Sequence, residues 1–476
     1  MENKKIISTS NGKLALYIVA LLILSAVTAI CGAMLLENSW KAVTNVWKIV
    51  PLSIGVFLGY VIVFIYMHYI LRKDKIQCGL LKGFLIIFSV MFVAILLSVT
   101  IYSYYSPYAM PIALVGLMVA LLLRQRLGFM SLFVTSLICA LMFAVDGARA
   151  NSFIGIFITT ITGIFMIFLI RQGYTRFRLT IGTMLIAIAM TVPSILFAFV
   201  EEGFNMDLLF KPLEVLLGNI AAIAIFTMAL PLYELATRMW TDFKLAEVCS
   251  LNQPLLKELR EKAPGTFNHS LTVANLVENC AMAIGINPYM ARACAYFHDV
   301  GKMKNPQFFV ENQKDGYNPH DELIPEISAS MIIRHTKNGE DILRSNHMPD
   351  EVIKAAAEHH GDTPVMYFYL KAKTITEGDL NMNEYRYEGP LPSTKYSALV
   401  MICDICEALT RSKQATSQEE LEETIGKVIK EKLLDGQFDK CEITVRDMAI
   451  IKNTICDTLP AISHKRIDYN KAKEAR

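Results

Sequence analysis

The sequence predicts an all-α protein with two parts: a polytopic helical membrane domain and, after it, an all-helical domain in water. Three observations predict this class. The 476 residues are 53% hydrophobic and 19% charged, which is more apolar than a soluble chain of this length needs. The first half of the chain repeatedly supplies long apolar stretches. From about Tyr233 the pattern changes to mixed charge with amphipathic helical spacing.

About eight membrane helices are predicted, because crossing a hydrocarbon core takes roughly 20 apolar residues in a helix. The predicted spans are 14–36, 49–71, 79–101, 108–123, 128–146, 153–170, 179–200 and 210–232, of which the fourth and sixth are short. Residues 1–13 form the N-terminal segment and 14–232 the transmembrane domain. The first span is a retained helix rather than a secretory signal, since no small-residue cleavage site ends its long apolar run.

Basic residues gather in every second loop, and short cytoplasmic loops retain positive charge. These residues are Lys4, Lys5, Arg72, Lys73, Lys75, Arg124, Arg126, Arg171, Arg176 and Arg178, while Lys41, Lys48 and Arg149 run against the trend. An even number of crossings then places both termini and the second domain in the cytoplasm. Membrane lipid is therefore a partner, and no basic tract indicates nucleic acid.

Polar groups inside a span are costly, so Glu214 and Asn219 are candidates for a ligand or ion site, with packing as the alternative. Residues 233–262 are predicted as a connecting helix. In it, 235–251 continues the last span into the cytoplasm, and Asn252-Gln253-Pro254 interrupts the helix. Such a helix either transmits a membrane event or acts as a tether. In the domain at 263–476, we expect a polar loop at 371–393 and an amphipathic helix at 419–434.

Seven histidines and carboxylates stand at helix-compatible positions of the second domain. They are His269, His298, Asp299, His335, His359, His360 and Asp404. A single histidine on a helix is usually a satisfied side chain, but such groups in apolar helices are costly unless they are paired or bind a metal. Imidazole with carboxylate suits first-row transition metals.

Seven ligands are too many for one ion with an open position, so the pattern predicts two divalent ions bridged by Asp299. A two-metal site can activate a water and neutralise charge on a phosphoryl group. The sequence therefore predicts phosphodiester hydrolysis.

The order His, His-Asp, His, His-His, Asp resembles that of the HD phosphohydrolase superfamily. More narrowly, five segments resemble the membrane-anchored cyclic di-AMP phosphodiesterases of the PgpH type, the seven-transmembrane receptors with an intracellular HD hydrolase. These segments are 263–270 (APGTFNHS), 296–304 (YFHDVGKMK), 311–313 (ENQ), 318–321 (NPHD) and 358–361 (EHHG).

The resemblance implies one metal held by His269, His298, Asp299 and Asp404, and a second held by Asp299, His335, His359 and His360. It also implies that the ions are iron or manganese, that the substrate is a cyclic dinucleotide, cyclic di-AMP, cleaved to linear pApA, and that the protein lies in the bacterial inner membrane.

Lys302 follows the His-Asp pair, where a cation can steady a phosphate, so it is predicted as catalytic beside Asp299. Its alternative role is to solvate a loop. Asn318, His320 and Arg411 are further candidates for substrate contacts. Cys403 and Cys406 bracket Asp404, but a redox pair is not expected within an apolar helix.

One departure from the family pattern concerns its large extracytoplasmic domain, which usually separates the first two membrane helices. Only Glu37–Trp47 separates them here, so sensing through such a domain is in doubt. Gly361-Asp362-Thr363-Pro364 stands where cyclic di-GMP hydrolases have Gly-Tyr-Pro, which favours cyclic di-AMP. Hydrolysis of cyclic di-GMP or another nucleotide, and a non-catalytic nucleotide-binding receptor, are the alternatives. A homodimer and an unknown ligand of the membrane domain stay open as partners.

Overall fold

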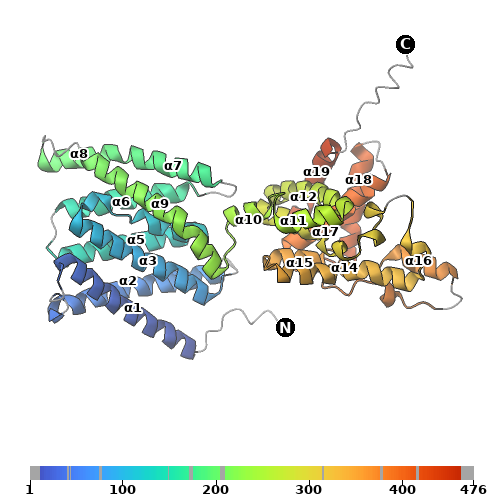
Figure 1. Ribbon diagram of the computed structural model, residues 1–476, viewed down its shortest axis with the longest axis horizontal. Coiled ribbons are helices and arrows are strands. Elements are labelled where there is room, and N and C mark those ends of the chain that lie inside the picture. The colour runs from blue at the N-terminus through green and yellow to red at the C-terminus, as the bar shows by residue number, and fades with distance from the viewer. Residues whose placement is uncertain are drawn as a thin grey trace, which may run out of the picture. The chain divides into compact units, whose positions relative to one another are not determined.

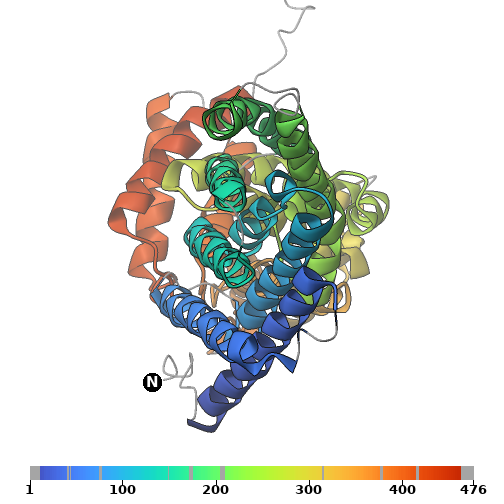
Figure 2. The ribbon, with the colours of Figure 1, turned by 90° about the vertical axis from the view of Figure 1, so that its left-hand side faces the viewer.

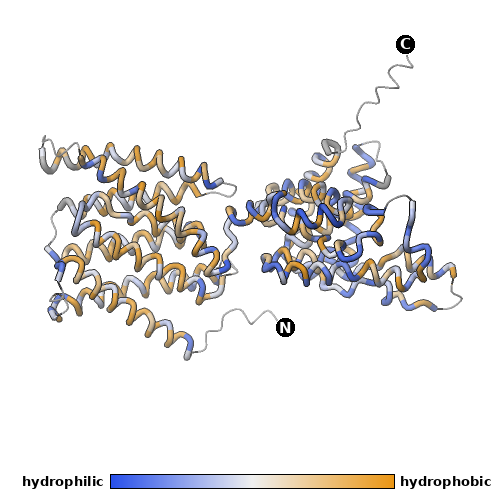
Figure 3. The backbone as a smooth tube through the Cα atoms, viewed as in Figure 1, coloured by the Kyte–Doolittle hydropathy of each residue, from blue (hydrophilic) through white to orange (hydrophobic). Residues whose placement is uncertain are grey.

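The computed structural model describes residues 11–39, 42, 44–73, 78–147, 150–170, 175–203, 210–313, 316–375, 379–413 and 418–462. Helices dominate these residues, as the fold class predicts. The chain divides into two compact units, residues 1–243 and 244–476 (Figure 1). The first unit is apolar along nearly all of its helices, whereas the second alternates polar and apolar residues (Figure 3).

The first unit contains the predicted apolar stretches as helices. They are α1 (Asn11–Glu37), α2 (Val46–Lys73), α3 (Leu80–Tyr104), η2 (Pro107–Ala109), α4 (Ala113–Leu122), α5 (Gln125–Val145), α6 (Ala150–Phe168), α7 (Arg176–Ala189), α8 (Thr191–Glu202) and α9 (Lys211–Thr237). Within the described residues, six helical stretches are long and apolar enough to cross a membrane, with α7 and most of α8 counted as one. The two shorter apolar helices, Pro107–Leu122 and Ser152–Phe168, match the two spans predicted as short.

The middle of the first unit is formed by α4, α5 and α6, which lie between the α1–α3 group and the α7–α9 group (Figure 2). Helix α4 is almost wholly buried. Of the basic residues that predict the orientation, Lys4, Lys5, Lys75 and Arg171 lie outside the described residues, as do Lys41 and Arg149, which run against the trend.

Glu214 and Asn219, the candidates for a membrane ligand site, both have protein partners. Glu214 Oε2 accepts a hydrogen bond from Ser106 Oγ at 2.6 Å and lies 4.0 Å from Lys211 Nζ. The buried Asn219 donates from Nδ2 to the backbone carbonyl of Val215 at 2.9 Å. These contacts are ones that packing alone can provide.

The predicted continuation of the last membrane helix through 235–251 is wrong. Helix α9 ends at Thr237, and Arg238 adopts a left-handed conformation with φ of 52°. Glu234 accepts a hydrogen bond from the Thr241 hydroxyl and lies 3.8 Å from the guanidinium of Arg176. These contacts hold the turned chain, so 233–262 is the end of α9 followed by two short helices, α10 (Asp242–Val248) and α11 (Pro254–Lys262). The predicted interruption at 252–254 is confirmed, and Gln253 caps α11.

The second unit packs helices around a shared core. Its remaining elements are α12 (Pro264–Ile284), α13 (Pro288–Phe297), η4 (Val300–Lys304), η5 (Pro306–Phe308), η6 (Val310–Asn312), η7 (Pro319–Asp321), α14 (Pro325–Ser345), α15 (Asp350–Glu358), α16 (Met366–Ile375), η8 (Met382–Tyr385), α17 (Lys395–Lys413), α18 (Gln418–Leu434) and α19 (Val445–Ile462). Helices α11 to α14 each begin with proline, whose fixed φ suits the first helical position.

Two expectations for this unit have different outcomes. The amphipathic helix predicted at 419–434 is confirmed as α18. The polar loop predicted at 371–393 is wrong at its start, because α16 extends to Ile375, and η8 follows within the same stretch. Arg386 pairs with Pro364 in an isolated bridge, so backbone pairing orders a segment whose composition alone indicates a loop.

Candidate metal centre

Five helices bring the seven predicted ligand residues together. His269 lies on α12, His335 on α14 and Asp404 on α17. The His298-Asp299 pair follows the last residue of α13, and the His359-His360 pair follows the last residue of α15. Because these helices pack on one another, residues distant in sequence share one buried site.

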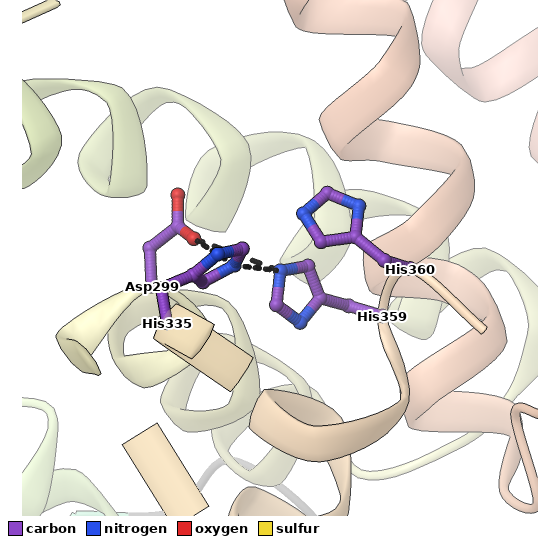
Figure 4. A group of neighbouring side chains, drawn as sticks. All are labelled: Asp299, His335, His359 and His360. Atoms are coloured by element: carbon purple, nitrogen blue, oxygen red, sulfur yellow. Dashed lines mark hydrogen bonds and ion pairs between the residues drawn. The ribbon is translucent and has the colours of Figure 1, made fainter. Parts of the chain in front are cut away.

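The seven side chains form two groups. Asp299, His335, His359 and His360 form one group (Figure 4), and His269, His298 and Asp404 form the other. Within each group the candidate ligand atoms lie within 4.8 Å of one another. The family resemblance implies the same two sets, but with Asp299 as a member of both.

Asp299 faces both groups with different oxygen atoms. Its Oδ2 lies 3.2 Å from His298 Nε2 and 3.8 Å from His269 Nε2. Its Oδ1 lies 3.3 Å from His335 Nε2 and 3.6 Å from His359 Nε2. A carboxylate in this position can serve two cations at once, one through each oxygen.

Three histidines are oriented by backbone carbonyl groups. The Nδ1 atoms of His298, His335 and His359 lie 2.7, 2.6 and 3.0 Å from the carbonyl oxygens three residues earlier. When Nδ1–H donates to such a carbonyl, the lone pair of Nε2 is left for a metal. Each of the three Nε2 atoms faces the centre of the site.

The residues present fit a pair of metal ions. His335 Nε2 and His359 Nε2 lie only 3.3 Å apart, so with both Nδ1 atoms protonated two lone pairs would repel unless a cation lies beside them. Among the residues that the structure describes, no hydrogen-bond partner is found for the buried atoms His298 Nε2 and Asp299 Oδ1. Buried polar atoms of this kind require an explanation, and an ion supplies one.

The electrostatics favour the ligand forms of several groups. Burial lowers the pKa of His359 to about 4 and that of His360 well below its usual value, so both imidazoles are neutral at pH 7. Burial alone would raise the pKa of Asp299, but the Lys302 ammonium and His298 hold it well below its usual range. A metal needs neutral imidazole and ionised carboxylate, which these shifts provide at His359, His360 and Asp299. Burial lowers the pKa of His269, but hydrogen bonds to Asp404 and Glu407 raise it to about 10, so at this residue a metal would replace a proton.

Lys302 is largely buried, with 13% of its side chain exposed, and lies between two carboxylates. Its Nζ donates to Glu311 Oε1 at 2.9 Å and lies 2.7 Å from Asp299 Oδ2. The ammonium also lies 4.9 Å from the centre of the Phe309 ring. Lys302 therefore lies beside the Asp299 carboxylate rather than in a solvated loop.

A cavity of about 510 Å³ opens beside the group that contains His269. It is lined by Gly265, Asn268, His269, Thr272, Val310, Glu311, Glu407 and Arg411. The Arg411 side chain is 51% exposed, so its guanidinium is available to an anion that enters.

Asn318 and His320 lie elsewhere in the unit and are absent from this lining. Asn318 Oδ1 caps η7 by accepting from the backbone N–H of His320 at 3.2 Å. His320 is buried, with Nε2 2.8 Å from the carbonyl oxygen of Phe308 and its ring against Phe368. These contacts hold the loop region from η5 to η7.

Sequence reasoning missed two residues of the site. Glu407 lies 2.8 Å from His269 Nδ1 through its Oε2, and its spacing of three residues after Asp404 on one helix could have indicated a shared face. Tyr387 stacks on His360 with ring centres 4.3 Å apart. No sequence signal pointed to it, because it comes from the segment predicted as a loop.

Two family models match the chain. The model described as HD domain matches residues 266–409, and that described as 7TM receptor with intracellular HD hydrolase matches residues 46–241.

Two relatives are named cyclic-di-AMP phosphodiesterase PgpH. The protein from Listeria monocytogenes is 37% identical over 76% of this chain and 50% of its own length. The protein from Bacillus subtilis is 32% identical over 92% of this chain and 62% of its own length. The chain thus spans between half and two thirds of these relatives. The solved HD domain of L. monocytogenes PgpH in complex with cyclic di-AMP is 46% identical over 45% of this chain and 99% of that one, with a TM-score of 0.43.

Proposed function

The chain belongs to the family of seven-transmembrane receptors with an intracellular HD hydrolase, and we propose that it is a metal-dependent phosphodiesterase that hydrolyses cyclic di-AMP to linear pApA. The observation that carries the proposal is the position of Asp299, with one oxygen toward each group of candidate ligands. The substrate is proposed from the printed activity of the relatives.

One ion would be held by His269, His298, Asp299 and Asp404, and the second by Asp299, His335, His359 and His360. Iron or manganese is the proposed metal, because imidazole and carboxylate together suit first-row transition metals. When bound, such ions supply Lewis-acid stabilisation of phosphoryl charge and lower the pKa of a water.

The protein's own residues prepare the site for an anionic substrate. Lys302 keeps Asp299 ionised and compensates its charge in a buried position. Arg411 at the cavity provides a second cation, on the side of His269, that can contact a phosphate of the substrate. Both residues act by charge and position and need not exchange protons with the substrate.

The membrane unit would place this site at the cytoplasmic face of the bacterial inner membrane. The distribution of basic residues among the loops supports this orientation, with both termini inside. Cyclic dinucleotides made in the cytoplasm could then reach the site without crossing lipid.

Turnover by the purified full chain in lipid nanodiscs, loaded with Mn²⁺ or Fe²⁺, tests the proposal. Cyclic di-AMP should be converted to pApA, measured by chromatography, and faster than cyclic di-GMP is cleaved. His298→Ala and Asp299→Ala should each lower the rate by about 10³-fold or more, because several kcal/mol of charge stabilisation is lost.

Asp447→Asn is the matched control, since this carboxylate bonds to Lys395 and Thr444 rather than to a candidate ligand. Binding of cyclic di-AMP without turnover would instead support a receptor, and faster cleavage of cyclic di-GMP would reject the proposed substrate. Normal activity of the Asp299 variant would remove the bridging role.

A further inference from the structure

His269 differs from the other oriented histidines in what holds its Nδ1 atom. The partners of His298, His335 and His359 are neutral backbone carbonyls of their own chain segments. The partner of His269 is the carboxylate of Glu407, at 2.8 Å and 138 positions away in sequence. Among these contacts, a full negative charge thus supports a histidine of the group with His269, but no histidine of the group with His335 and His359.

Helix α17 holds both nitrogen atoms of this imidazole. Asp404 Oδ1 lies 2.9 Å from Nε2, and Glu407 Oε2 lies 2.8 Å from Nδ1. The two carboxylates are three residues apart and therefore project from one face of the helix. Glu407 is only 7% exposed, so its interaction with the ring is little screened by water.

We infer that Glu407 is a positioning residue that strengthens the metal held by His269, His298 and Asp404. By accepting a hydrogen bond from Nδ1–H, Glu407 fixes the tautomer and the orientation of the ring and makes Nε2 a better electron donor. The inference rests on the proposed metal centre. It adds that Glu407, which lies outside both ligand groups, raises the affinity of the protein for only one of the two ions.

The effects of the two charged residues Arg411 and Glu407 should be separable by experiment. Its Nη1 lies 3.7 Å from the other carboxylate oxygen of Glu407, and its side chain is half exposed. An exposed ion pair contributes little, so Arg411 should matter for substrate and Glu407 for metal. Variants of the two residues can therefore distinguish binding of the metal from binding of the nucleotide.

The test measures Mn²⁺ stoichiometry and dissociation constants on the purified full chain in nanodiscs, without substrate. Glu407→Gln preserves the size of the side chain and one acceptor oxygen but removes the charge, and Glu407→Ala removes both. We expect one of the two ions to bind about 10-fold more weakly in Glu407→Gln and about 100-fold more weakly in Glu407→Ala. The affinity of the second ion should stay within about twofold, and Arg411→Gln and Asp447→Asn should leave both ions unchanged.

Each other outcome decides against the inference. Equal weakening of both ions in Glu407→Gln would indicate a general structural role. Unchanged ion affinities with a higher KM for cyclic di-AMP would make Glu407 a substrate contact, since it also lines the cavity. If Glu407→Ala binds two ions with the same affinities as the wild-type chain, the inference fails but the proposed function does not. If the wild-type chain binds none, the proposed function fails with it.

Discussion

Many buried hydroxyls of the membrane unit use partners in their own helix, whereas the candidate metal centre depends on partners from different helices. In the membrane unit, the hydroxyls of Thr135 and Thr162 each donate to a carbonyl one helical turn earlier, at 2.8 Å, although Ser106 and Glu214 pair over a longer range. In the second unit, His269 meets Glu407 and Asp404 from a different helix. Local pairing suits a helix that must satisfy itself in lipid, whereas the candidate site needs side chains from several helices.

Removing the metal should produce the largest effect, and this effect should be confined to the second unit. At an ion concentration about 100-fold above the dissociation constant, one bound ion stabilises by about 2.7 kcal/mol. We expect chelation to abolish turnover and to speed amide hydrogen exchange in α12, α13, α14 and α17, measured by mass spectrometry.

The membrane unit should not respond to chelation. Trp40, Trp47 and Trp240 are the chain's three tryptophans, and all precede residue 244, so their fluorescence reports on that unit. A shift of this fluorescence with the same metal dependence as the exchange would contradict the division.

Gly301→Ala should produce the next largest effect, by separating the helices of the site. A Cβ atom at this position would lie 1.9 Å from the carbonyl oxygen of His335 and 2.5 Å from the backbone nitrogen of Gly339. Helix α14 would have to move, at a cost of about 1–3 kcal/mol in the free energy of unfolding. We expect a lower Tm and weaker metal binding through His335.

Gly426→Ala is the control for that substitution. A Cβ there would meet only the flexible end of Lys452 at 3.6 Å, an ordinary contact. In α18 the change should be neutral, or stabilising by up to about 1 kcal/mol. Equal destabilisation by both variants would show that the effect comes from replacing a glycine by alanine in general and not from a clash at the site.

Thr135→Val should produce the smallest effect. The hydroxyl is buried, but its bond to the carbonyl of Ser131 lies within one helix, and that carbonyl keeps its helical partner. Buried polar contacts in membrane proteins average about 0.6 kcal/mol. Unfolding in mixed detergent should therefore change by less than about 1 kcal/mol, and a loss of several kcal/mol would contradict the local character of pairing in this unit.

Features that depend on local contacts could be predicted from the sequence, whereas features that depend on long-range contacts were often missed. Apolar length predicted the membrane helices because satisfaction within a helix needs no distant partner. The seven candidate ligands could be named because side chains that are costly to bury recur in a specific order. Arg238 could not be predicted to end α9, because arginine has no preference for the left-handed region, and the turn depends on Arg176 and Glu234 meeting. Tyr387 was missed for a similar reason, since only pairing with a distant segment orders it.

The central claim is that seven side chains hold two cations with Asp299 between them. Anomalous X-ray diffraction from crystals of the Mn²⁺-loaded chain measures this most directly. The account predicts two peaks, one beside His269, His298 and Asp404 and the other beside His335, His359 and His360, each next to a different oxygen of Asp299. A single peak, or two peaks with Asp299 beside only one of them, would contradict it.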